Sequence, residues 1–70
     1  MDKIQISLAA ARVNAGLTQE DVARALKVSK QTIINWENGK SEPLISQGRE
    51  LSNLYDMPLD YIIFLPPKSN

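Results

Sequence analysis

Apolar positions in this chain recur at the spacing of amphipathic helices, in short stretches separated by residues that start or stop a helix. In the first stretch Leu8, Arg12 and Ala15 lie at helical spacing, with Ala11 beside them and Gly16 as a stop signal. This pattern predicts a helix over residues 4–15.

The second stretch has a clear start. Thr18 is a favourable N-cap, and Asp21 three residues later completes an approximate capping box. Leu17, just before the cap, is suited to pack on Val22 as a hydrophobic staple. The pattern predicts a helix over residues 19–26.

The same arrangement follows at once. Ser29 is the next N-cap, Ile33 and Trp36 form an inward face, and Gly39 suits the left-handed position that ends a helix. The predicted helix covers residues 30–38. Only residues 27–29 separate it from the helix before, and two short helices joined by so tight a turn cross steeply, as in a helix-turn-helix.

The C-terminal third predicts two more helices and no strand. An apolar stripe after Pro43 predicts a fourth helix over residues 44–55, and Leu59, Ile62 and Ile63 predict a short fifth helix. The fold class is therefore all-α, a five-helix domain over residues 1–65 followed by a flexible tail over residues 66–70.

Composition narrows the possible functions. The chain has neither Cys nor His, so disulfides are excluded and a structural zinc site is not expected. With no glycine-rich phosphate loop and no carboxylate pair in a plausible cleft, we expect no enzyme, no cofactor and no small-molecule ligand. Apolar runs are far shorter than the ~20 residues of a membrane span, so we expect a cytoplasmic protein without a membrane partner.

Charge by itself gives little support for nucleic-acid binding, because the net charge is zero. Its distribution is weakly polarised. Residues 1–41 carry six basic and four acidic residues, whereas residues 42–70 carry two basic and four acidic ones.

The predicted helix over residues 30–38 has an outward face that could read DNA. At 100° per residue, one arc contains Lys30, Gln31, Ile34, Asn35 and Asn38. In the major groove, amides read adenine, Lys reads guanine and apolar groups contact the thymine methyl. The alternative is an ordinary solvated helix face.

Several stretches together resemble one family. The segments 16–23 (GLTQEDVA), 26–29 (LKVS) and 36–40 (WENGK), with Ile33 and Pro43, closely resemble the Cro/lambda-repressor-like (XRE-type) helix-turn-helix family. Residues 51–62 (LSNLYDMPLDYI) look like that family's fourth and fifth helices. The resemblance covers about residues 4–64 and implies binding to a double-stranded DNA operator, typically as a repressor of a phage or bacterium.

The resemblance also implies roles for individual residues. The positions that match Lys30, Gln31 and Asn35 reach base edges in the family, and Ile34 lies beside them. Those that match Gln19, Asn38 and Lys40 contact backbone phosphates. Arg12 and Glu37 match an ion pair that joins the first helix to the end of the third.

A single helix-turn-helix module buries little protein surface on DNA, so we expect a homodimer on two half-sites. The apolar residues at the end of the chain are candidates for its interface, namely Tyr61, Phe64 and Leu65. The alternative function is a protein-interaction or antitoxin-type module whose main partner is a protein.

Overall fold

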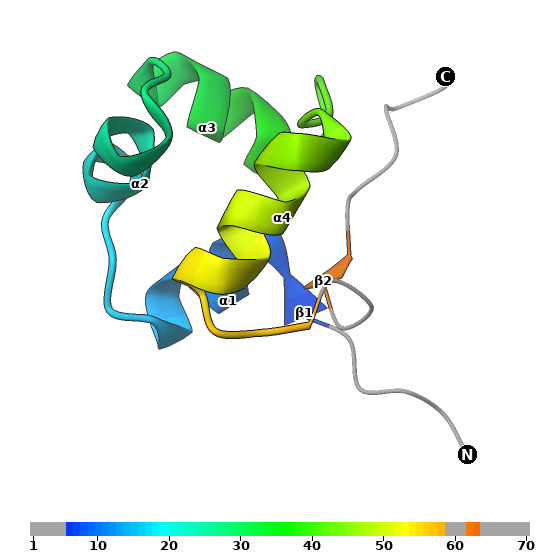
Figure 1. Ribbon diagram of the computed structural model, residues 1–70. Coiled ribbons are helices and arrows are strands. Elements are labelled where there is room, and N and C mark those ends of the chain that lie inside the picture. Colours follow the sequence, from blue (N-terminus) through cyan, green and yellow to red (C-terminus); the bar gives the residue numbers. More distant parts are fainter. Residues whose placement is uncertain (1–5, 59–61, 64–70) are drawn as a thin grey trace.

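The computed structural model describes residues 6–58 and 62–63 of the chain, and four helices and two very short strands are found there. In order they are β1 (Ile6–Ser7), α1 (Leu8–Asn14), α2 (Gln19–Leu26), α3 (Lys30–Asn38), α4 (Ile45–Leu54) and β2 (Ile62–Ile63). In Figure 1, α2 and α3 form one side of the molecule, α4 crosses in front of α1, and β1 and β2 lie side by side.

The two central helices were predicted correctly, because their caps are encoded locally. Thr18 Oγ1 accepts a hydrogen bond from the Asp21 amide at 3.0 Å, and Asp21 Oδ2 accepts one from the Thr18 amide at 2.9 Å. At α3, Ser29 Oγ accepts from the Thr32 amide at 3.1 Å, and Gly39 ends the helix with φ of 77°. These bonds satisfy amides that helix ends otherwise leave unpaired.

The first helix starts later than predicted. Ser7 is its N-cap and accepts a hydrogen bond from the Ala10 amide at 3.1 Å, so α1 begins at Leu8 rather than at residue 4. Residues 6 and 7 instead form β1, and the chain leaves α1 at Asn14.

The predictions of no strand and of a fifth helix through Ile62 and Ile63 were both wrong. These two residues form β2, which pairs in parallel with β1 in the register Ile6↔Ile62 and Ser7↔Ile63. The physical reason is that β-branched residues favour extended backbone, and β1 offers unpaired peptide groups beside them. The rest of the predicted fifth helix, including Leu59, lies outside the described residues.

The fourth helix is close to its prediction. It covers Ile45–Leu54, one residue shorter at each end than expected, and Gln47 Oε1 accepts a hydrogen bond from the Leu44 amide at 2.8 Å at its start. The predicted domain boundary at residue 65, the tail over residues 66–70 and the dimer candidates Tyr61, Phe64 and Leu65 lie outside the described residues.

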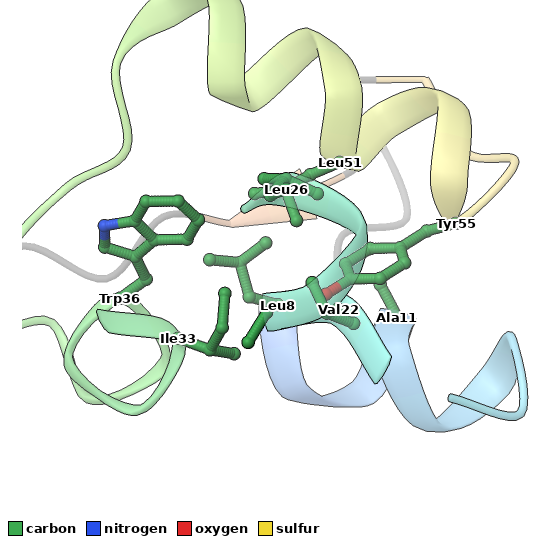
Figure 2. Packing of buried hydrophobic residues seen from close by; sticks show 9 residues of the cluster. Leu8, Ala11, Val22, Leu26, Ile33, Trp36, Leu51 and Tyr55 are labelled. Atoms are coloured by element: carbon green, nitrogen blue, oxygen red, sulfur yellow. The ribbon is translucent and has the colours of Figure 1, made fainter. Parts of the chain in front are cut away.

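One apolar core joins all four helices. Figure 2 shows side chains from each helix directed into a single cluster. Its members are Leu8, Ala11, Val22, Ala23, Leu26, Ile33, Trp36, Leu51 and Tyr55, all at most 9% exposed. Leu17, the residue predicted to staple α2, and Val28, just before the cap of α3, are half-buried and pack against this core. The core therefore fixes α3 from its inner side.

Candidate nucleic-acid interface

The turn between α2 and α3 sets the orientation of the third helix. Lys27 ends α2 in the left-handed region, with φ of 61°, and the Val28 amide donates to the Ala23 carbonyl at 3.0 Å. The chain thus changes direction within the three residues that separate α2 from α3, and the last of them, Ser29, caps α3. This is the helix-turn-helix arrangement that the spacing predicted.

The inner and outer faces of α3 differ sharply. Ile33 and Trp36 are 1% and 5% exposed and belong to the core. On the other side, Lys30, Gln31 and Asn38 are exposed, whereas Ile34 and Asn35 are half-buried. The side chains predicted to contact bases thus share an accessible face, on which Ile34 and Asn35 are less exposed than Lys30 and Gln31.

Two of these side chains are bonded to each other. Gln31 Nε2 donates a hydrogen bond to Asn35 Oδ1 at 3.0 Å, one helical turn along the outer face. Helical periodicity predicted that they share a face, but it gave no indication of this bond or of its direction.

Arg12 and Glu37 form the predicted ion pair between α1 and α3. Arg12 Nε lies 2.7 Å from Glu37 Oε2, and Arg12 Nη2 lies 3.4 Å from Glu37 Oε1. The side chains are only 15% and 7% exposed. The hydrogen bond to Glu37 raises the pKa of Arg12, against the opposing effect of burial. Arg12 Nη1 also donates to the Leu17 carbonyl at 3.0 Å, so one guanidinium joins α1, α3 and the residue before the α2 cap.

Gln19 is part of the same network, which sequence reasoning missed. Its Nε2 donates to Glu37 Oε1 at 3.0 Å, so that the first residue of α2 is tied to the end of α3. The two residues are 18 positions apart and follow no periodicity that would reveal the contact; only the tertiary fold brings them together. The side chain is half-buried and stands at the N-terminus of α2, where backbone amides favour an anion.

Tyr55 is the other group that the sequence did not single out. It is the C-cap of α4 and is 5% exposed. Burial, followed by the negative charge of Glu37, raises the pKa of Tyr55 to about 12, while Arg12 opposes this effect. The charges of Glu37 and Arg12 therefore act on the phenol of Tyr55.

Lys40 and Asn38, predicted to contact phosphates, are exposed at the end of α3. The Lys40 amide donates to the Asn35 carbonyl at 2.9 Å, which holds the turn after Gly39 against the helix. The only acidic residue of α3 is Glu37, which is paired with Arg12. The exposed face of the helix therefore carries amides and a lysine without a carboxylate.

The described residues lack the features of two other kinds of site. Residues 6–58 and 62–63 contain no cluster of three or more Asp, Glu, His or Cys residues arranged to hold a metal ion. Over these residues, every helix is too short or too polar to traverse a lipid bilayer.

Comparison with known proteins gives the family. A family model described as helix-turn-helix matches residues 8–62. The HTH-type transcriptional regulator ImmR of Bacillus subtilis (strain 168) is 34% identical over 53 residues, which are 76% of this chain and 42% of the relative. The uncharacterised HTH-type transcriptional regulator MJ0272 of Methanocaldococcus jannaschii is 39% identical over 46 residues, which are 66% of this chain and 70% of the relative.

The chain thus spans less than half the length of ImmR and about two thirds of MJ0272. No solved structure matches it significantly. The family match covers all four helices and reaches the first residue of β2. This chain belongs to the helix-turn-helix family of the XRE type.

Proposed function

We propose that this chain binds double-stranded DNA in a sequence-specific way and regulates transcription, with α3 in the major groove. The observation that carries the proposal is the outer face of α3, where Lys30, Gln31 and Asn35 are accessible while Ile33 and Trp36 hold the helix to the core. The major groove admits one α-helix, and amide and ammonium groups are suited to its base edges. Both relatives are HTH-type transcriptional regulators, which supports the regulatory role.

Electrostatics near α3 supports the same proposal despite the zero net charge. Lys30 and Lys40 are exposed at opposite ends of the helix, and the charge of Glu37 is offset by Arg12 at 2.7 Å. A phosphate backbone approaching this face meets cations and helix N-termini. In our proposal Lys30, Gln31, Ile34 and Asn35 contact bases, whereas Gln19, Asn38 and Lys40 contact phosphates.

The Gln19 contact is compatible with its bond to Glu37. A glutamine amide has two protons on nitrogen, and only one is donated to Glu37. The second is available for a phosphate oxygen. Arg12, Glu37 and Gln19 would then fix the position of a phosphate contact relative to α3, which is how backbone contacts set register.

We further propose that the protein acts as a homodimeric repressor. Two modules on half-sites about one helical turn apart supply the contact area that one module lacks. Such a dimer covers DNA that a polymerase would need. A reporter gene whose promoter contains the selected site tests this role: expression should fall when the protein is produced, and unchanged or increased expression would contradict it.

The experiment that tests DNA binding is selection from a random duplex pool, followed by mobility shift at several salt concentrations. We expect a two-fold symmetric site, with its half-sites about 10 base pairs apart, bound about 10³-fold or more tightly than random DNA. If the selection enriched no DNA sequence over the starting pool, sequence-specific binding would be contradicted.

A protein partner is the second candidate function. Leu44 and Ile45, adjacent at the start of α4, are 68% and 76% exposed, and exposed apolar groups are common at protein interfaces. This alternative would be favoured if the selection enriched no DNA sequence and the chain formed a stable complex with a partner protein through these two residues.

A further inference from the structure

The hydrogen bond between Gln31 and Asn35 has a direction, and that direction decides which atoms the two side chains leave free. Gln31 Nε2 is the donor and Asn35 Oδ1 the acceptor, at 3.0 Å. Across the part of the chain that the structure describes, no protein group bonds to Gln31 Oε1 or to Asn35 Nδ2. Gln31 therefore keeps an acceptor and one proton on nitrogen, whereas Asn35 keeps an NH₂ group.

The atoms left free on Gln31 match adenine. In the major groove adenine presents the N6 amino group as donor and N7 as acceptor. Gln31 Oε1 can accept from N6 while the second Nε2 proton is donated to N7, and the first proton remains with Asn35. The bond to Asn35 thus holds the amide in the orientation that bidentate contact with adenine requires.

Asn35 has the opposite character, because its oxygen already accepts from Gln31. Its NH₂ group needs an acceptor. Guanine presents two acceptors, O6 and N7, and thymine presents O4, whereas adenine has its N6 donor beside its one acceptor, N7. Cytosine presents only the N4 donor there and would be rejected. Four residues of helix advance about 6 Å, which is one to two base-pair steps of about 3.4 Å. The two side chains therefore reach different base pairs.

We propose that Gln31 and Asn35 act as one reading unit, in which their mutual hydrogen bond sets adenine as the preference at one base pair and a base that presents acceptors without a donor, guanine or thymine, at a nearby one. This inference rests on the proposed DNA binding and adds the base classes and their interdependence. The unit differs from two independent contacts because a change in one side chain alters the base preference of the other.

A substitution that keeps the shape of the side chain but replaces its amide by a carboxylate tests the direction of the bond. Gln31→Glu removes both protons, so the only favourable arrangement is donation from Asn35 Nδ2 to the introduced carboxylate. Asn35 would then turn its oxygen toward the groove. Relative to the unaltered protein, we expect the preference at the Asn35 base pair to shift by about tenfold from guanine or thymine toward bases with an amino donor, cytosine or adenine.

The control variant is Asn38→Asp, which makes the same amide-to-carboxylate change on the same helix outside the pair. It should weaken binding to every sequence alike, because a new negative charge repels phosphates. Preferences are therefore compared as ratios of affinity between duplexes that differ at one base pair, so that a uniform loss cancels.

A double-mutant cycle keeps the test informative where Gln31→Glu binds too weakly to compare. Gln31 is exposed, Asn35 is half-buried and neither belongs to the core, so Gln31→Ala, Asn35→Ala and the double variant should keep the fold, which circular dichroism checks. Asn35→Ala should reduce the adenine preference at the Gln31 base pair about fivefold although Gln31 is retained. Additive effects in the cycle, or an unchanged preference at the Asn35 base pair in Gln31→Glu, would overturn the reading unit while leaving DNA binding intact. Failure of the unaltered protein to select any sequence would instead refute the proposed function.

Discussion

Arg12 Nε lies 2.7 Å from Glu37 Oε2, and this ion pair connects α1 to the last turn of α3 at a site almost closed to solvent. Gln19 donates to the other oxygen of the same carboxylate at 3.0 Å. Three helices therefore meet at Glu37, and we expect the orientation of the outer face of α3 to depend on the pairing of this one largely shielded carboxylate.

Removing Arg12 should destabilise the fold strongly. Arg12→Met leaves the Glu37 carboxylate, 7% exposed, without a cation, and we expect the free energy of unfolding to fall by about 3 kcal/mol. The double variant Arg12→Met/Glu37→Leu should recover most of this loss, because no buried charge remains. Urea unfolding measures each value.

A solvent-exposed ion pair provides the control. Arg24 Nη1 lies 3.6 Å from Asp21 Oδ1, with side chains 74% and 39% exposed, so Arg24→Ala should cost less than about 1 kcal/mol. If Arg12→Met were no more damaging than Arg24→Ala, burial of the pair would have no energetic importance.

The proposed contacts to bases and the proposed contacts to phosphates should respond differently to truncation. Gln31→Ala should cost about 1–3 kcal/mol at the selected site and relax the base preference at the positions that Gln31 and Asn35 contact, leaving the other positions unchanged. Lys40→Ala should weaken binding to all sequences alike and lower the salt slope by about one. Mobility shift across a panel of sites and salt concentrations measures both; the same profile for the two variants would refute this division.

Tyr55 should make the fold sensitive to alkali. Its pKa in the fold is about 12, above the ordinary 10.0, so the neutral phenol is favoured in the folded chain. The associated stability is complete below pH 10.0 and is lost as the pH rises toward about 12, since the unfolded chain releases the proton more readily.

The measurement compares the unaltered protein with Tyr55→Phe by urea unfolding at about pH 9 and about pH 11. The unaltered protein should lose more stability between these values than the variant, and other titrating groups cancel in the comparison. Equal losses would mean that the phenol is not held neutral by the fold.

The α2 cap should contribute to sensitivity to acid. The hydrogen bond donated by the Thr18 amide lowers the pKa of Asp21 below its ordinary 3.8. Stability from the charged carboxylate is present above pH 3.8 and is lost as the pH falls through the lower value of the folded state.

Asp21→Ala should therefore be less stable than the unaltered protein near neutral pH, and this difference should shrink at about pH 2. Glu20→Ala is the matched control, since it removes an acidic side chain from the same helical turn without breaking the capping box. If the difference in stability between Asp21→Ala and the unaltered protein did not change with pH, the charge of Asp21 would have no role in the cap.

The backbone at the end of α2 offers a stabilising change. Lys27 adopts φ of 61°, a backbone conformation that costs a residue with a Cβ about 1–2 kcal/mol. Glycine avoids this strain but loses more conformational entropy on folding. Lys27→Gly should therefore raise the free energy of unfolding by about 0.5–1 kcal/mol. Gly16 has φ of +75° with open space where a Cβ would lie, so Gly16→Ala should lose about 1 kcal/mol through backbone strain alone. Calorimetric melting measures both, and shifts of the same sign would contradict the role of the left-handed backbone.

Much of the fold follows from short-range signals. The limits of α2 and α3 could be predicted because Thr18, Ser29 and Gly39 determine their ends through bonds within one turn. The later start of α1 depends on Ser7, whose cap competes with the helical periodicity on either side. β1 and β2 could not be predicted, because two-residue strands show no alternation and their pairing joins distant parts of the sequence.

The candidate interface divides in the same way. Helical geometry identified its outer face, and family resemblance supplied the pairing of Arg12 with Glu37. The bond from Gln19 to Glu37 and the direction of the bond from Gln31 to Asn35 depend on side-chain conformation in three dimensions, which no spacing along the chain encodes.

The parallel pairing of Ile6 with Ile62 also bears on how the chain folds. Contacts between α2 and α3 join residues that are close in sequence. Because closing such a short loop loses little conformational entropy, these contacts can form early in folding. Pairing of β1 with β2 must close a loop of about 55 residues and should be among the last events to occur. In hydrogen exchange, the amides of this pair should open without the rest of the molecule, which would make the short sheet a separately melting unit of the native state.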